Sequence, residues 1–207
     1  MVILMADARF IAVKLLYKTF SDESFSNIQL NSGLKKSGLD DRDKKLCSLI
    51  YYGVIERKIY LDYVIEKFSV RPLKKLDDVI LNILRCGIYQ LMFTENIPES
   101  AVVNECVSLA RKFGKKSASG MVNAVLRNFI RQGKTVTLPE DKLQRYSVEY
   151  SASPEFVKSL VNDYGEELTV NLLSDSLGNP PVTVRMNNLK CTQQEFISVL
   201  GNIKVIK

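Results

Sequence analysis

The chain has 207 residues, of which 46% are hydrophobic and 25% charged, and its formal net charge is +6. With only 10 Gly and 6 Pro, this composition excludes a disordered or fibrous protein and is typical of an ordered, soluble globular one with one or two domains. Histidine is absent, which excludes Ser-His-Asp and Cys-His nucleophiles, His-ligated zinc and histidine acid–base chemistry within the chain.

Apolar residues recur every three or four positions through most of the first 132 residues, and this period predicts helices. The first helix covers residues 5–20, with Tyr17 on its core-facing stripe. Residues 21–41 are polar and predict a loop with one short helical turn. A second helix is predicted from about Asp41 and buries Leu49 and Val54, and a third helix continues to Phe68. The proline in residues 71–72 then ends the helical pattern.

Residues 74–94 have the clearest helical period in the sequence and predict the central, most buried helix. Gly87 lies on its apolar face, where a missing side chain lets a neighbouring helix approach closely. Two more helices are predicted over 98–113 and 118–131, with Gly114 between them. The first two thirds of the chain therefore predict an all-α bundle.

The pattern changes after residue 132. A linker over 133–139 places a boundary near residue 135, and residues 136–178 show short helical patterns that predict a helical linker region. Residues 182–187 alternate as a strand does, Thr192 caps a predicted helix, and residues 202–207 begin a second strand. Residues 179–207 therefore predict the start of a small α+β (βαβ) domain, and we expect the sequence to be truncated.

The basic charge is concentrated in the first part of the chain. Residues 1–135 hold 22 Lys and Arg against 14 Asp and Glu, whereas residues 136–207 hold 7 against 9. No acidic residue lies between Glu105 and Glu140, and the basic residues of that interval are Arg111, Lys112, Lys115, Lys116, Arg127, Arg131 and Lys134. A stretch of one sign indicates a polyanion or a membrane surface as partner, and a solvated helix face is the alternative.

The four cysteines are Cys47, Cys86, Cys106 and Cys191, and no two of them form a C-x-x-C pair. This spacing predicts reduced core thiols in a cytoplasmic protein and no metal site. We find no signal peptide and no run of about 18 apolar residues, so we expect no membrane association.

Three blocks of sequence are distinctive: D-K-K-L-C-S-L-I-Y-Y-G-V-I-E-R at 43–57, I-P-E-S-A-V-V-N-E-C-V at 97–107 and V-N-A-V-L-R-N at 122–128. They resemble the N-terminal domain of the bacterial ribosomal RNA small-subunit methyltransferase B family, also called Sun or Fmu, a domain similar to the antitermination factor NusB. Residues 164–167 and P-P-V-T-V-R-M-N-N-L-K at 180–190 resemble the segment that leads into the catalytic half of these enzymes. A free-standing NusB has no such extension, which favours the methyltransferase.

The resemblance implies a parent enzyme that makes 5-methylcytosine in 16S ribosomal RNA by cysteine attack on the base and methyl transfer from S-adenosylmethionine. The Gly-rich cofactor loop and the Pro-Cys nucleophile of that family are not found in these 207 residues. We therefore expect no catalytic, cofactor-binding or metal-binding residue in this chain, which alone should be inactive.

The candidate RNA-binding residues are Arg9, Lys14, Lys18, Lys115, Lys116, Arg127 and Arg131. The resemblance implies a role for Arg9, because NusB-like domains direct arginines at that position to RNA. Lys14 and Lys18 are one helical turn apart, as are Arg127 and Arg131, so each pair shares a face. Such groups bind phosphates with little readout of bases. The alternative for them is a solvated helix face, and Arg127 has a second alternative, bracing the helix pair.

Three functions are compatible with these observations. The favoured one is the RNA-binding N-terminal region of a ribosomal RNA cytosine-5 methyltransferase. The rivals are a NusB-type transcription antitermination factor that binds RNA and a helical adaptor whose basic surface meets an acidic protein.

Overall fold

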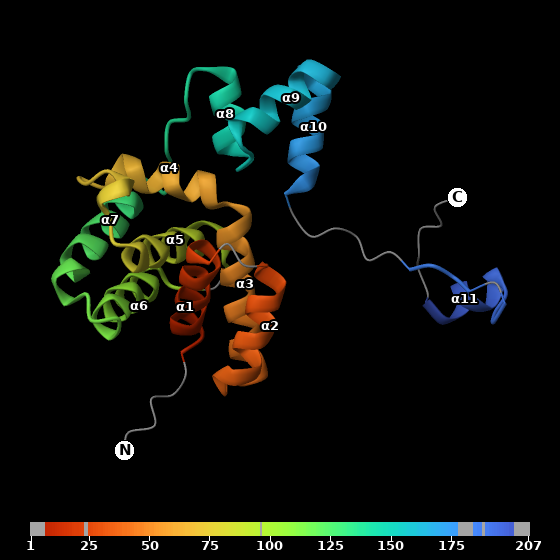
Figure 1. The fold of residues 1–207 in the computed structure, drawn as a ribbon, viewed down its shortest axis with the longest axis horizontal. Coiled ribbons are helices and arrows are strands. Elements are labelled where there is room, and N and C mark those ends of the chain that lie inside the picture. The colour runs from red at the N-terminus through yellow and green to blue at the C-terminus, as the bar shows by residue number, and fades with distance from the viewer. Residues whose placement is uncertain (1–6, 23–24, 96, 178–183, 188, 201–207) are drawn as a thin grey trace. The chain divides into compact units, whose positions relative to one another are not determined.

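A computed structural model describes residues 7–22, 25–95, 97–177, 184–187 and 189–200 (Figure 1). The chain forms two compact units, Met1–Asp175 and Ser176–Lys207.

The first unit is helical and contains no strand in its described part. Its helices are α1 Ala8–Ser21, α2 Ser26–Ser37, α3 Asp41–Glu56, α4 Lys58–Phe68, α5 Asp78–Phe93, α6 Glu99–Lys112, α7 Ser119–Arg131, α8 Lys142–Glu149, α9 Pro154–Tyr164 and α10 Glu166–Ser176. Short 3-10 turns occupy Leu73–Lys75 and Lys116–Ala118. The predicted all-α bundle is confirmed.

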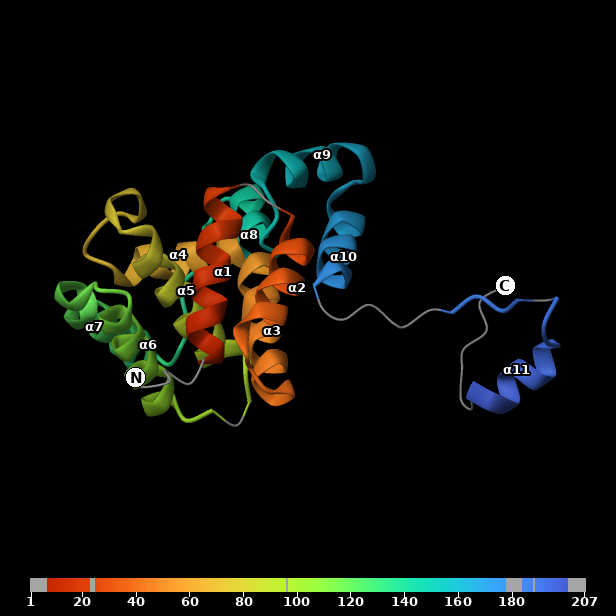
Figure 2. The same cartoon turned by 60° about the horizontal axis from the view of Figure 1, so that its bottom comes forward.

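Helix α5 is the centre of the bundle. Every residue from Ile80 to Leu91 is buried, and α5 packs against α1, α3, α4, α6 and α7, as Figures 1 and 2 show. Asp77 is the N-cap of this helix. Its carboxylate accepts hydrogen bonds from the backbone amides of Val79 and Ile80 and so satisfies donors that the first turn leaves unpaired. The central helix predicted over 74–94 is confirmed.

Two glycines allow other helices to approach α5 closely. A Cβ at Gly87 would lie 3.0 Å from Cys106 Sγ of α6 and from Leu126 Cδ1 of α7, so the predicted close approach is confirmed. At Gly53 of α3 a Cβ would lie 2.0 Å from the ring of Tyr89, a contact that real Cβ atoms do not make. The α3–α5 packing therefore requires glycine there.

Helix α2 stands where the sequence predicted a loop over 21–41, so that prediction was wrong. The helix is mostly polar, and its apolar contact is made by Leu30, which is buried, and Leu34, which is partly buried. Gly33 is so near α1 that a Cβ there would lie 2.4 Å from Leu15 Cδ2. Packing on α1 and α3 (Figure 2) supplies the stabilisation that such a short apolar stripe lacks by itself.

Two residues predicted to be in the core are exposed. Tyr17 of α1 is 41% exposed and Leu49 of α3 is 49% exposed. The helices bury a narrower stripe than the sequence pattern indicates, because α1 presents Ala12, Val13 and Leu16 to its neighbours.

A buried ion pair joins α4 to α5. Arg85 donates from Nε and Nη2 to the two carboxylate oxygens of Asp62, at 2.6 and 2.8 Å, and from Nη1 to Asn82 Oδ1 at 2.8 Å. The Arg85 side chain is only 7% exposed and that of Asp62 17%. The ring of Phe20 lies 5.1 Å from the guanidinium carbon. This arrangement satisfies the guanidinium away from water.

Helices α8–α10 belong to the same compact unit as the bundle. Helix α8 packs against α4, where the backbone amide of Tyr60 donates to Ser151 Oγ at 3.0 Å. The Tyr63 hydroxyl donates to the carbonyl of Thr137 at 2.7 Å. The domain boundary predicted near residue 135 stays a prediction. These two hydrogen bonds join residues that precede this boundary to residues that follow it.

The second unit contains α11 Gln193–Leu200, which confirms the helix predicted after Thr192. The Glu195 carboxylate accepts from the Thr192 amide at 2.8 Å and the Thr192 hydroxyl accepts from the Glu195 amide at 3.4 Å, a capping box. Residues 184–187 form no strand, so the predicted βαβ domain is not supported, since a strand needs partners to pair its backbone. Residues 182–183 and the second predicted strand over 202–207 lie outside the described residues.

All four cysteines are free, and Cys47, Cys86 and Cys106 are buried as predicted, whereas Cys191, also predicted to be a core thiol, is not in the core. Burial, together with the nearby Asp43 carboxylate, raises the pKa of Cys47 to about 12. Burial also raises the pKa of Cys106 to about 12 and that of Cys86 well above its usual value. These three thiols are therefore protonated at neutral pH and suit a structural role. Cys191 is partly buried in the second unit.

Candidate RNA-binding surface

Arg9 lies where α1 crosses α5. Asp7 is the N-cap of α1, and its Oδ1 accepts from the Arg9 amide at 2.9 Å. The Arg9 side chain donates from Nε to Gln90 Oε1 at 2.8 Å, and the buried Gln90 donates in turn to the carbonyl of Cys86 at 2.9 Å. Arg9 is thus partly buried and braced by the central helix. Lys14 and Lys18, on the same helix, are exposed.

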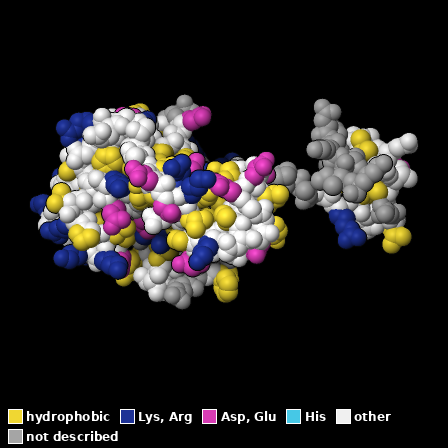
Figure 3. Space-filling model, turned by 90° about the horizontal axis from the view of Figure 1, so that it is seen from above, with side chains coloured by type: hydrophobic (Ala, Val, Ile, Leu, Met, Phe, Trp, Pro, Cys, Tyr) yellow, Lys and Arg dark blue, Asp and Glu magenta, His cyan; other side chains and the backbone are white. Residues whose placement is uncertain are grey.

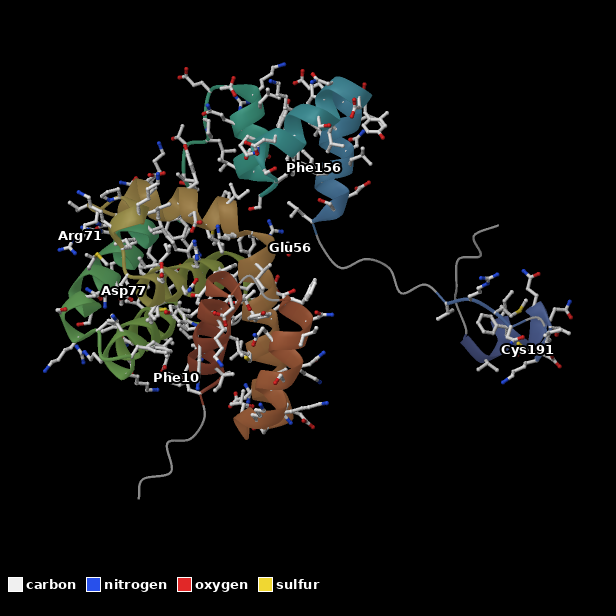
Figure 4. The ribbon with its side chains drawn as sticks, in the orientation of Figure 1. Phe10, Glu56, Arg71, Asp77, Phe156 and Cys191 are labelled. Atoms are coloured by element: carbon white, nitrogen blue, oxygen red, sulfur yellow. The ribbon has the colours of Figure 1, made fainter. Side chains whose placement is uncertain are left out.

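The start of α1 meets the end of α6. The rings of Phe10 and Phe113 stack with their centroids 4.4 Å apart, and Figure 4 shows Phe10 at this end of α1. Lys112 Nζ lies 3.1 Å from Asp7 Oδ2. The fold therefore brings the segment that contains Arg9 near the end of the helix that precedes Lys115 and Lys116.

Lys115 is held by an ion pair. Its Nζ donates to Asp77 Oδ2 at 2.5 Å. This hydrogen bond raises the pKa of Lys115. Burial opposes ionisation of Asp77, but the bond from Lys115 and the amides of Ile80 and Val79 together lower its pKa. Lys116 is exposed in the 3-10 turn that follows.

Folding neutralises part of the acid-free stretch that the sequence analysis identified. Three of its seven cations pair with acids from distant positions: Lys112 with Asp7, Lys115 with Asp77 and Lys134 with Glu99. Within the described part of the chain, the other four make no ion pair; they are Arg111, Lys116, Arg127 and Arg131. The net positive charge of this stretch is therefore smaller than the sequence indicates, and two of these four cations, Arg127 and Arg131, lie on α7.

The two arginines of α7 are each bound by an asparagine one turn earlier. Arg127 donates from Nε to Asn123 Oδ1 at 2.9 Å, and Arg131 donates from Nη2 to Asn128 Oδ1. Both arginines are exposed. Helix α7 contacts the end of α4, where the rings of Phe68 and Phe129 meet edge to face at 5.4 Å.

The sequence analysis missed basic residues beside α7. Lys67 lies in the last turn of α4, and Arg71, Lys74 and Lys75 follow in the connection to α5; all four are exposed. Figure 4 shows Arg71 projecting from this connection, and in Figure 3 Lys and Arg side chains gather along the edge of the unit on the α6 and α7 side. Four basic residues within 67–75 were the available signal, but Glu66, Asp77 and Asp78 cancelled it in the local charge.

Metal and membrane sites are not seen in the part of the chain that the structure describes. No cluster of His, Cys, Asp or Glu there is arranged to hold a metal ion. No helix among these residues combines the length and the apolar character that a membrane span requires.

The packing of α1–α7 around a buried α5 defines an all-helical bundle of the NusB type. The solution structure of NusB from Aquifex aeolicus superposes with a TM-score of 0.53 at 20% identity, covering 65% of this chain and 95% of that one. The NusB family model matches residues 6–131, and the chain belongs to the NusB family.

Similarity to two kinds of relative extends over different lengths. The probable ribosomal RNA small subunit methyltransferase B of Bacillus subtilis is 32% identical over 194 residues, which are 93% of this chain and 43% of that protein. The transcription antitermination protein NusB of Ruminiclostridium cellulolyticum is 35% identical over 119 residues, 56% of this chain and 80% of that protein. The resemblance inferred from the sequence is confirmed, and the chain spans less than half the length of the methyltransferase.

Proposed function

We propose that this chain is the RNA-binding N-terminal part of an S-adenosylmethionine-dependent 16S ribosomal RNA cytosine-5 methyltransferase that works in the cytoplasm. Its role is to hold the ribosomal RNA so that a separate catalytic domain can extrude and methylate one cytosine. The methyl donor and the catalytic cysteines belong to that domain.

The observation that carries this proposal is the extent of the similarity. The antitermination protein matches little more than half of the chain, whereas the methyltransferase matches 93% of it. The additional matched residues include the region of α8–α10, which lies beyond the residues that the NusB family model covers. A protein that acted only as an antiterminator would not need them.

The surface chemistry supports RNA as the partner. Among the described residues, the cations of α7 and of the connection before α5 form no ion pair. They suit the phosphate backbone, which supplies most of the affinity of sequence-independent RNA binding. Antitermination stays the second candidate, because the NusB relative shares 35% identity with this bundle.

The isolated chain should not bind S-adenosylmethionine or methylate RNA, because no Gly-rich cofactor loop or Pro-Cys nucleophile occurs in its sequence. Isothermal titration calorimetry of residues 1–207 with the cofactor should show no heat of binding at micromolar concentrations. A measurable micromolar affinity would contradict the assignment of the cofactor site to a separate domain.

Deleting the gene from its host should remove one 5-methylcytosine from 16S ribosomal RNA. Bisulfite sequencing of that RNA measures the change, and a strain that regains the intact gene is the control. An unchanged methylation pattern together with altered transcription through ribosomal RNA genes would contradict the methyltransferase and favour the antitermination factor.

A further inference from the structure

A depression lies between the C-terminal ends of α4 and α7. It has a volume of about 520 Å³, and the residues that line it are Lys67, Phe68, Asn128, Arg131 and Gln132. A second depression of about 400 Å³, lined by Arg127, Ile130 and Arg131, adjoins it along α7. Arg131 borders both.

The lining of the first depression is rich in hydrogen-bond donors. It contains two cations, Lys67 from α4 and Arg131 from α7, and the side-chain amides of Asn128 and Gln132, but no carboxylate. Among the described residues no acid forms an ion pair with Lys67 or Arg131. Such a set of donors, with an arginine fork and an ammonium group, recognises a phosphate.

Each of the two arginines that border the depressions donates a hydrogen bond to an asparagine of its own helix. Asn128 accepts a hydrogen bond from Arg131, and Asn123 accepts one from Arg127 at 2.9 Å. Arg127 and Arg131 are four residues apart on one helix, a rise of about 6 Å, so their guanidinium groups follow one another along α7.

We propose that the depression between α4 and α7 binds a phosphate of single-stranded RNA through Lys67 and Arg131, and that Arg127 contacts a neighbouring phosphate of the same strand. This proposal rests on the RNA-binding function proposed above. Its main phosphate contact is made by Lys67 and Arg131, and Lys67 is not among the candidate residues that the sequence indicated. Arg9 has a smaller part, because it is partly buried at the α1–α5 contact, whereas Arg127 and Arg131 are exposed.

The test measures binding of a fluorescent 12-nucleotide oligouridine by anisotropy over a range of salt concentrations. For single strands the slope of log K against log salt changes by about 0.7 for each phosphate contact. The double variant K67Q/R131Q should therefore lower the slope by about 1.4 and weaken binding roughly 10-fold or more. The matched control is K35Q/K36Q, which removes two exposed lysines of α2 and should leave both quantities unchanged.

Each other result has a defined meaning. If the wild-type chain binds the RNA but the two double variants behave alike, the phosphate site is wrong and the RNA-binding function stands. If the wild-type chain binds no RNA, both proposals fail. Equal affinity for a peptide nucleic acid of the same bases would overturn the phosphate site. Tighter binding of oligoglutamate than of the oligouridine, at equal charge, would overturn it in favour of an acidic protein partner. Circular dichroism verifies that both variants fold.

Discussion

Replacing Asp62 by alanine should lower the free energy of unfolding by about 3 kcal/mol, because it leaves the Arg85 guanidinium in the interior without its counter-charge. The two oxygens of Asp62 accept both hydrogen bonds that Arg85 directs toward α4, at 2.6 and 2.8 Å. Asp62 is 17% exposed, which places the expected loss near the lower end of the range for broken buried pairs. Urea unfolding followed by circular dichroism measures it.

Two further variants test whether the loss of stability comes from the unpaired Arg85 guanidinium. Lys44→Ala breaks the exposed pair between Lys44 and Asp41, whose side chains are 40% and 94% exposed, and should change stability by less than about 1 kcal/mol. The double variant D62L/R85M removes both charges and should be more stable than Asp62→Ala by about 1–2 kcal/mol. If the double variant is the less stable of the two, the loss comes from packing and not from the unpaired guanidinium.

Leu84→Ala should lower the free energy of unfolding by roughly 2–5 kcal/mol, through lost transfer energy and the cavity left behind. Leu84 is fully buried on α5, the helix that five others contact, so few neighbours can move to fill the space. Chemical unfolding of the variant beside the unmodified chain gives the value. A loss below about 1 kcal/mol would show that α5 is peripheral to the stability of the bundle.

Leu49→Ala is the matched control for that measurement. The change removes the same atoms from a leucine of the same bundle, but Leu49 is 49% exposed. Its loss should remain below about 1 kcal/mol, since half of the side chain is already in water. A loss as large as that of Leu84→Ala would mean that the sequence-based assignment of Leu49 to the core was right.

The sequence by itself determined the features that depend on local period. The apolar stripe of residues 74–94 predicts α5, and Gly87 on that stripe predicts the close helix approach that its contacts with Cys106 and Leu126 show. Blocks of sequence within 43–131 identified the family, which the match over residues 6–131 confirms. Neighbours in sequence fix these properties, because one face of one helix is enough to define them.

Only the tertiary structure decided which groups meet across the bundle. Lys112 pairs with Asp7, 105 positions away; Lys115 pairs with Asp77, 38 positions away; and Arg85 pairs with Asp62, 23 positions away. The unpaired positive charge on the folded chain is therefore smaller than a count along the sequence indicates. Helix α2 likewise exists because Leu30 is buried and Gly33 packs against Leu15 of α1. Of the strand predicted at 182–187, residues 184–187 have no pairing partner among the described residues. Such contacts depend on how the helices cross, and a periodic pattern within one segment contains no information about the partner that segment meets.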